Sequence, residues 1–185
     1  MESGIRYEAR HVVFSGSTGS KRLFARRVEE GDADRVLALQ QRVSEYMPDP
    51  DHMALMDREA LMDAIRFDFG ICLMNGDELV AYTQMVVNRS CEGNHGEHFG
   101  FPAEKCVTFD ISFVDPAWRG LGIQKFFIQE RERAAIELGA ELGFVTVSPD
   151  NAPSLNNLVS QGFEVHLRGK FYGDRDRYLM KKVLG

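Results

Sequence analysis

The stretch "DPAWRGLGIQ", Asp115–Gln124, decides how the middle of this 185-residue chain folds. An apolar run, "CVTFDISFV" (106–114), precedes it, and a helix-like stretch, "FFIQERERAAIEL" (126–138), follows it. We therefore expect a strand over 106–114 and a helix over about 121–138, joined by a tight turn. The glycines of that turn, Gly120 and Gly122, either make the corner or leave room for a ligand to reach the backbone.

A strand-to-helix junction of this kind favours anions. The first N–H groups of a helix have no partner within the helix, and the helix dipole makes that end favourable for negative charge. Gly120 and Gly122 put no side chain where a phosphate would approach, and Arg119 adds a positive charge. The segment is therefore built like a pyrophosphate cradle, while the alternative that the glycines only turn the chain stays open.

Two common nucleotide-binding loops do not fit the sequence. A dinucleotide loop needs a third glycine where Lys125 stands, and no acidic residue follows at the right distance. A phosphate loop of the ATP-binding type needs an unbroken Gly-Lys pair, but in "FSGSTGSKR" (14–22) Ser20 separates Gly19 from Lys21. We interpret that stretch as a linker.

The rest of the chain predicts one α/β domain. We expect residues 1–22 to form an N-terminal extension, in which "RYEARHVVF" (6–14) allows an extra strand, and residues 23–185 to form the domain. The expected order is β α α β β β α β α β β. The first half contains a strand Leu23–Val28, a helix capped by Asp32 and ending at Met47, a helix at about 57–67 and a hairpin over 69–87. A polar loop over 89–105 leads to the strand 106–114 and the helix 121–138, and a strand 144–147 then lies parallel to the strand 106–114. A short helix and a closing hairpin over 164–184 complete the domain.

Charge and hydropathy restrict the partners of this domain. The net charge of −6, from 22 basic and 28 acidic residues, argues against a nucleic-acid surface, which needs a basic stripe. The charge suits a cationic substrate, although most solvated surfaces look the same. No apolar run is long enough to span a bilayer, and the N-terminus does not resemble a signal peptide. We therefore expect a cytoplasmic protein that binds neither membrane nor nucleic acid.

The cysteines do not predict a metal site. Cys72, Cys91 and Cys106 are odd in number and lack paired spacing, as is typical of reduced thiols. Cys91, His95, His98 and Cys106 include both metal-ligating residue types, but their spacing matches no common zinc pattern. We expect no metal.

At this point the sequence resembles a known family. "FVDPAWRGLGIQKFFIQ" (113–129) is similar to the acetyl-coenzyme A (acetyl-CoA) loop of the GNAT superfamily of N-acetyltransferases, whose signature is Arg/Gln-x-x-Gly-x-Gly/Ala. Arg119, Gly122 and Gln124 occupy its three marked positions, and Gln124 departs from the usual small residue. The resemblance implies that acetyl-CoA is the cosubstrate and that the loop binds it through Arg119, Gly120, Leu121, Gly122, Ile123 and Gln124.

A second segment supports the resemblance, which covers residues 23–184. "SPDNAPSLNNLVSQGFEV" (148–165) is similar to the family's Asn-x-x-(Ala/Ser)…Gly-Phe segment, with Asn151, Ser154, Gly162 and Phe163 on its marked positions. The family fold is a mixed, mostly antiparallel sheet that is split between its fourth and fifth strands. The resemblance implies that the pantetheine arm lies in the split and that Asn151 and Ser154 help to bind it.

The resemblance also implies direct attack of an amine on the thioester. Asp110 is a carboxylate within an otherwise apolar strand, so it needs a partner or a function. It stands where many family members carry a glutamate that acts as a base, and the alternative is a structural carboxylate at a strand bulge. A backbone N–H of Phe113 or Val114 would hold the thioester oxygen.

The general acid is less clear from the resemblance. The family often has a tyrosine four residues before the Gly-Phe glycine, and here Leu158 stands at that position. Tyr172 and Tyr178 in the closing hairpin are candidates to replace it. A core or surface role is the alternative for each, and a thiolate leaves readily enough that catalysis need not use an acid.

The acceptor is defined only by class, as an amine of a small molecule or peptide. Candidates to select it, by position alone, are His95, His98, Phe99, Phe101, Arg175 and Arg177. Transfer to a hydroxyl and assembly into a homodimer stay open. A rival interpretation is a non-catalytic acyl-CoA sensor or partner-binding module on the same fold, which Leu158 favours and Asp110 with the intact loop disfavours.

Overall fold

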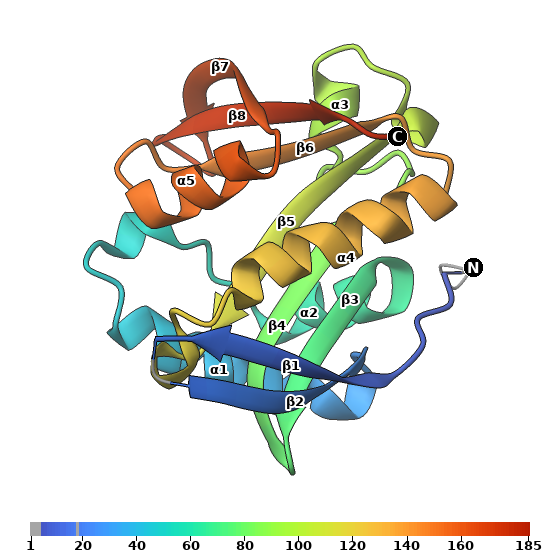
Figure 1. The fold of residues 1–185 in the computed structure, drawn as a ribbon. Helices are drawn as coiled ribbons and strands as arrows, with labels where there is room; N and C mark the ends of the chain where they lie inside the picture. Colours follow the sequence, from blue (N-terminus) through green and yellow to red (C-terminus); the bar gives the residue numbers. More distant parts are fainter. Residues whose placement is uncertain (1–4, 18) are drawn as a thin grey trace.

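The computed structural model describes residues 5–17 and 19–185. Within these residues eight strands form one sheet in the order β1-β2-β3-β4-β5-β6-β8-β7 (Figure 1). All neighbouring strands are antiparallel except β5 and β6. The strands are β1 (Arg10–Gly16), β2 (Gly19–Arg27), β3 (Phe69–Asn75), β4 (Glu78–Val86), β5 (Cys106–Val114), β6 (Leu142–Val147), β7 (Glu164–Phe171) and β8 (Arg175–Val183). The predicted mixed, mostly antiparallel α/β sheet is confirmed.

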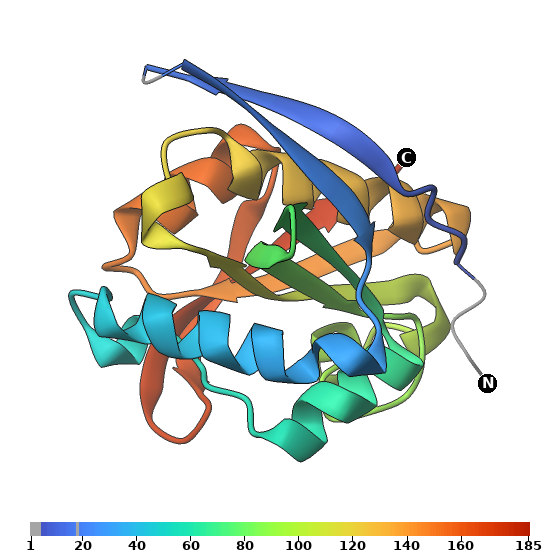
Figure 2. The same cartoon turned by 90° about the horizontal axis from the view of Figure 1, so that it is seen from below.

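Helices cover both faces of this sheet (Figure 2). One face carries α1 (Ala33–Glu45) and α2 (Arg58–Phe67), whose apolar stripes, including Leu39 and Leu61, pack on the strands. The other carries α4 (Ile123–Glu137) and α5 (Ala152–Ser160), with Phe127 and Leu158 in a second apolar cluster. Along the part of the chain that the structure describes, no helix is long and apolar enough to cross a membrane.

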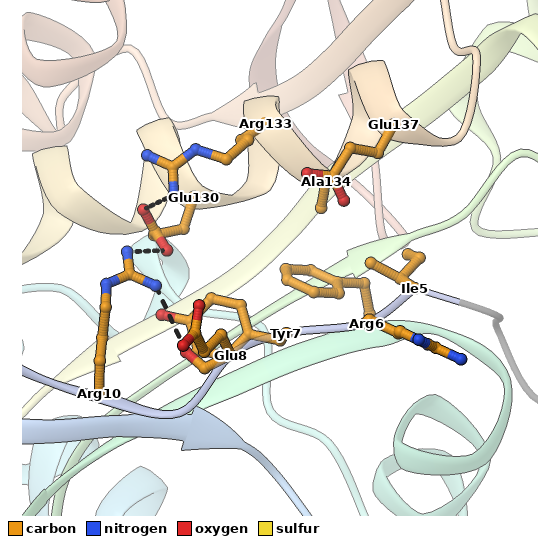
Figure 3. Close-up of a pocket in the computed structure, with 10 residues that line it drawn as sticks. Ile5, Arg6, Tyr7, Glu8, Arg10, Glu130, Arg133, Ala134 and Glu137 are labelled. Atoms are coloured by element: carbon orange, nitrogen blue, oxygen red, sulfur yellow. Dashed lines mark hydrogen bonds and ion pairs between the residues drawn. The ribbon is translucent and has the colours of Figure 1, made fainter.

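The N-terminal residues add a hairpin to the sheet, which corrects the prediction of a linker at 14–22. Strands β1 and β2 pair from Arg10 opposite Ala25 to Gly16 opposite Gly19, so the Gly/Ser-rich stretch makes the turn of the hairpin. Arg10 also donates a hydrogen bond to Glu130 of α4 (2.7 Å), which anchors this segment to the helix (Figure 3). The division of the chain at residue 22 stays a prediction, although β2 crosses it.

The start of α1 differs from the expected cap. Asp32 does occupy the position before the helix, but its side chain does not cap it. The carboxylate instead accepts hydrogen bonds from Arg26 (2.6 and 2.8 Å) and from the Glu29 N–H (3.0 Å). The ion pair with Arg26 draws the carboxylate back toward β2, so it stabilises the junction between strand and helix rather than the helix terminus.

Strands β5 and β6 pair over a short length only. Their register covers Cys106–Thr108 against Leu142–Phe144, and beyond these residues the two strands diverge (Figure 1). The second half of β5 therefore has β4 on one side and the opening toward β6 on the other. This opening is the expected split in the sheet.

A bulge in β5 lies at the start of the split. Thr83 of β4 is opposite Ser112, but Met85 is opposite Phe109, so β5 contributes one residue more than β4. A bulge bends its strand and increases the local twist, which helps β5 to turn away from β6. The Thr83 hydroxyl donates to the Ile111 carbonyl (2.8 Å) and so satisfies a backbone group that the bulge displaces from the ladder. At the bulge, Asp110 and Ile111 of β5 lie opposite the single residue Gln84 of β4.

The polar loop 89–105 contains short helical segments that were not predicted. Helix α3 (His95–His98) packs over β5 and β6, and a 3-10 turn, η3 (Ala103–Lys105), leads into β5. Gly96 permits this packing, since a Cβ there would lie 2.5 Å from the Cys106 Sγ. The close contact fixes α3, and therefore His95, beside the split.

Candidate active site

The glycine turn opens α4 as expected. Gly120 and Gly122 both have φ of 78°, a left-handed conformation that side chains rarely adopt. A Cβ at either position would meet no atom within 4 Å. No side chain of the described residues caps the helix, which begins directly after Gly122. The glycines therefore make the corner and also leave open space before the first N–H groups of α4.

Contacts from α1 and from the N-terminal hairpin fix the segment around this turn. Asp115 accepts hydrogen bonds from the Ala117 N–H (3.0 Å) and from Arg42 of α1 (2.9 Å), which fixes the short turn η4 (Pro116–Trp118). From the N-terminal hairpin, Gly16 lies against the turn, because a Cβ on it would stand 2.7 Å from the Gly120 carbonyl oxygen. Sequence reasoning missed this contact because it placed residue 16 in a linker. Arg119 itself is exposed.

Gln124, the departure from the family signature, joins the two predicted cofactor segments. Its amide donates to the Ser154 hydroxyl (3.1 Å) and accepts from Asn157 (2.7 Å), both on α5. Asn151 in turn caps α5, accepting from the Ser154 N–H (3.3 Å). The structure thus brings Gln124, Asn151 and Ser154 together, with the start of α5 beside the start of α4.

Of the two candidate oxyanion donors, the backbone geometry favours Val114. The Asp115 N–H donates to the Val80 carbonyl of β4 (3.0 Å). Because successive N–H groups of a strand point to opposite edges, the N–H of Phe113 also faces β4, whereas that of Val114 faces the split. Phe113 is buried, and its side chain packs in the cluster under α1 and α2.

Asp110, which is itself half-buried, ends a chain of hydrogen-bonded polar groups at the bulge. Gln84 donates to its carboxylate (2.5 Å), and Tyr82 donates to the other end of the Gln84 amide (2.7 Å). Burial raises the pKa of Asp110, while the hydrogen bond from Gln84 and the charge of Arg131 lower it. The alternative role for Asp110 was that of a structural carboxylate at a strand bulge. The bulge is present, but the carboxylate accepts its hydrogen bond from the Gln84 side chain rather than from the backbone.

Arg131 is a buried cation that sequence reasoning missed. From α4 it donates to the carbonyls of Gln84 (3.2 Å) and Phe127 (3.3 Å), and its guanidinium lies 4.8 Å from the Phe109 ring centre. Burial lowers its pKa to about 9, against the opposing effect of the Asp110 charge. A charged residue on the otherwise apolar face of α4 was the available signal.

The two candidate tyrosines lie on opposite faces of the sheet. The Tyr172 hydroxyl is hydrogen-bonded to Nε2 of His95 (3.1 Å) and to the Thr146 hydroxyl (2.9 Å) of β6. Burial and then the Asp110 charge raise the pKa of Tyr172 to about 12. Tyr178 packs against the cluster under α4 and α5, with the Arg168 guanidinium 5.8 Å from its ring centre. The structure therefore brings Tyr172, but not Tyr178, toward Asp110 and the split.

The remaining candidates separate into core and loop residues. Leu158, in the family's tyrosine position, is buried in the core. Arg175 and Arg177 bind the segment between α1 and α2, donating to the carbonyls of Met53 (2.9 Å) and Asp51. These contacts join the closing hairpin to the α1–α2 segment on the face that carries Asp110.

The aromatic and metal-ligating candidates lie around α3. Phe101 packs on Phe144, with ring centres 5.4 Å apart, and Phe99 lies 6.4 Å from Phe171. The ring centres of His98 and His95 lie 6.4 Å apart. Among residues 5–17 and 19–185, no three His, Cys, Asp or Glu side chains come together as a metal site would require.

Comparison with known proteins identifies this arrangement. The sequence matches the Acetyltransferase (GNAT) family over residues 36–163, so the chain belongs to that family. The predicted enzyme class, an acetyltransferase, is thereby confirmed. No curated protein matches the chain in sequence.

Solved structures share the fold at low identity. The structure of yncA from Salmonella typhimurium with its cofactor acetyl-CoA has a TM-score of 0.68 at 15% identity, covering 89% of this chain and 95% of that one. The GNAT domain of PAT from S. lividans has a TM-score of 0.68 at 17% identity, covering 97% of this chain and 100% of that one. The ribosomal-protein-S18-alanine N-acetyltransferase from Escherichia coli has a TM-score of 0.66 at 14% identity, covering 87% of this chain and 93% of that one. The predicted cosubstrate, acetyl-CoA, agrees with the family and with the first of these structures.

Proposed function

We propose that the chain transfers an acetyl group from acetyl-CoA to an amine of a small molecule or peptide, by direct attack in a ternary complex. The observation that carries this proposal is the split beside β5, with the carboxylate of Asp110 at its bulge and the open N-terminus of α4 beyond its end. In the proposal the backbone of Arg119–Gln124 binds the pyrophosphate, and Asn151 and Ser154 line the same side.

Asp110 acts as the base in this mechanism. An alkyl amine is mostly protonated at neutral pH, so attack on the thioester requires that a proton be removed. Burial raises the pKa of Asp110, which makes the carboxylate a stronger base, while the hydrogen bond from Gln84 and the charge of Arg131 favour its ionised form. Gln84 also holds the carboxylate in one orientation through its 2.5 Å hydrogen bond.

The other two steps use groups that face the split. The N–H of Val114 stabilises the oxygen that becomes negative when the amine attacks the carbonyl carbon. The Tyr172 hydroxyl gives a proton to the sulfur as the C–S bond breaks. Its position supports this role because it bonds Thr146, two residues beyond the last residue of β6 that pairs with β5.

Thiol release from acetyl-CoA across a panel of amines tests the proposal. The panel should contain polyamines, amino-sugar and amino-acid amines, and short peptides with free N-termini. We expect thiol release above background with at least one amine, and a loss of about 10²-fold or more in Asp110→Asn, the usual size of a general-base effect. Asp77→Asn, at an exposed turn, is the matched control.

Two results would contradict the proposal. Tight binding of acetyl-CoA without release by any amine would favour the sensor interpretation. Full activity of Asp110→Asn at neutral pH would assign that carboxylate to structure.

A further inference from the structure

Tyr172 has an unusual backbone for its residue type. Its φ of 51° makes it the one non-glycine residue with positive φ among residues 5–17 and 19–185. It opens the turn between β7 and β8, followed by Gly173 with φ of 93°. Positions of this kind strongly prefer glycine, asparagine or aspartate, so a tyrosine there is strained. Strain of this sort persists only where the surroundings hold the residue in place, and it is common at functional sites.

The side chain shows what holds it. The residue is 45% exposed, and its hydroxyl is hydrogen-bonded to both His95 and Thr146. These two partners come from different elements, α3 and β6. His95 is itself fixed, since its backbone N–H donates to the Thr108 hydroxyl of β5 (3.0 Å).

The protonation of His95 limits what it does for Tyr172. Burial lowers the pKa of His95 to about 4, so its imidazole is neutral at physiological pH. A neutral imidazole either donates or accepts at Nε2, depending on the tautomer. If Nε2 carries the proton and the Thr146 hydroxyl also donates, the phenolic oxygen accepts both hydrogen bonds, and the proton of the phenol is directed to a third partner in the split.

We propose that His95 and Thr146 are positioning residues that donate two hydrogen bonds to the Tyr172 oxygen, so that Tyr172 presents its proton to the sulfur of coenzyme A. The inference rests on the proposed function. When the C–S bond breaks, its electron pair passes to sulfur and the phenolic proton moves to the same atom. The attacking nitrogen gives up two protons in all, the first to Asp110 before attack and the second to water once the C–N bond has formed. The phenolate that remains is stabilised by the two donors until water returns a proton, and Asp110 releases its own proton to water, so the reaction releases one proton overall.

The charged and titratable groups around the Tyr172 hydroxyl come from several elements. They are His95 and His98 on α3, Asp110 on β5 and Arg177 on β8. Asp110 disfavours a phenolate and Arg177 favours it. The two donors therefore offset a neighbouring negative charge at the moment when the phenol loses its proton.

The thiol of free coenzyme A provides a test that needs no acceptor. We would measure the affinities of coenzyme A and acetyl-CoA by titration calorimetry between pH 6.5 and 9.5. Only coenzyme A has an ionising thiol, which in an alkyl thiol titrates near about pH 8.5. If the Tyr172 hydroxyl donates to sulfur, the thiolate binds more tightly, and the ratio of the two affinities rises about tenfold with pH, as expected for one hydrogen bond to a charged group.

Variants assign this rise to the three side chains. Tyr172→Phe should abolish it, and Tyr178→Phe, the same change on the other face of the sheet, should leave it as in the parent. His95→Leu and Thr146→Val should each reduce it, and His95→Gln, which restores an N–H donor, should recover most of it. In the Tyr172→Phe background His95→Leu should change the ratio no further. The affinity for acetyl-CoA reports in each case that the variant is folded.

Several outcomes would overturn the inference. The first is that the affinity ratio still rises with pH in Tyr172→Phe. The second is that the ratio rises as much as in the parent in both His95→Leu and Thr146→Val. The third is that His95→Leu changes the ratio equally in the parent and in the Tyr172→Phe background, which lacks the hydroxyl. A parent that binds both ligands with a constant ratio would overturn this inference alone. A parent that binds neither would instead refute the proposed function.

Discussion

Replacing Gly122 by alanine separates the two roles of the glycine turn. Gly122 has φ of 78°, and an alanine in this left-handed conformation costs about 1–2 kcal/mol. No atom lies within 4 Å of the added Cβ, so no steric clash increases that cost. A domain of this kind has a free energy of unfolding of about 5–15 kcal/mol, so Gly122→Ala should stay folded.

Gly139 provides a control with the same backbone cost. It lies just after the other end of α4, has φ of 75°, and a Cβ there would also meet no atom within 4 Å. Gly139→Ala should therefore lower the free energy of unfolding by about the same 1–2 kcal/mol. The two variants differ in one respect, because only the methyl group at Gly122 stands before the first N–H groups of the helix.

The expected difference is in the affinity for coenzyme A. Losing one charge-assisted hydrogen bond to a phosphate costs about 1.5–3 kcal/mol, which weakens binding about 10- to 150-fold. Titration calorimetry with coenzyme A, together with urea denaturation of each variant, measures both quantities. Equal affinities in Gly122→Ala and Gly139→Ala would show that the glycines only turn the chain, and the pyrophosphate cradle would be refuted.

Three further substitutions test other parts of the site. Arg119→Ala should weaken coenzyme A binding by about 1–3 kcal/mol, as one charge-assisted contact would, and unchanged affinity would remove Arg119 from the cradle. Burial raises the pKa of Asp110 in the folded state above its pKa in the unfolded chain. The contribution of the protonated carboxyl to the free energy of unfolding is therefore complete below the unfolded-state pKa and is lost as pH rises through the folded-state pKa. Asp110→Asn should therefore be more stable to urea than the parent at neutral pH, and a less stable variant would contradict that sign. Gly96→Ala brings a Cβ to 2.5 Å from the Cys106 Sγ and should lower the free energy of unfolding by about 1–3 kcal/mol, whereas unchanged stability would show that α3 is loosely packed.

The sequence predicted the parts of the fold that depend on local patterns. The strand 106–114, the glycine turn and the helix after it carry strong neighbouring signals, and the structure has β5 and α4 at those positions. The Asn-Gly turn likewise identified the hairpin of β3 and β4. The Gly/Ser stretch at 14–22 misled because glycine and serine are common both in linkers and in hairpin turns. The pairing of β1 with β2 makes the stretch a hairpin turn. This hairpin joins the sheet because Phe24–Arg27 of β2 pair with β3, which is distant in the sequence and cannot be recognised from a local pattern.

The two halves of the proposed site differ in how far the sequence could reveal them. The cofactor half is built from backbone at one strand-to-helix junction together with Asn151 and Ser154 at the start of α5, so two short motifs describe it almost completely. The half that would handle protons is built from side chains that the topology brings together, and Tyr172 lies 77 positions from its partner His95. A leucine at the family's tyrosine position, Leu158, therefore says little about whether a phenol is present. A strained turn can deliver one from the closing hairpin, and the loop before β5 can hold it in place.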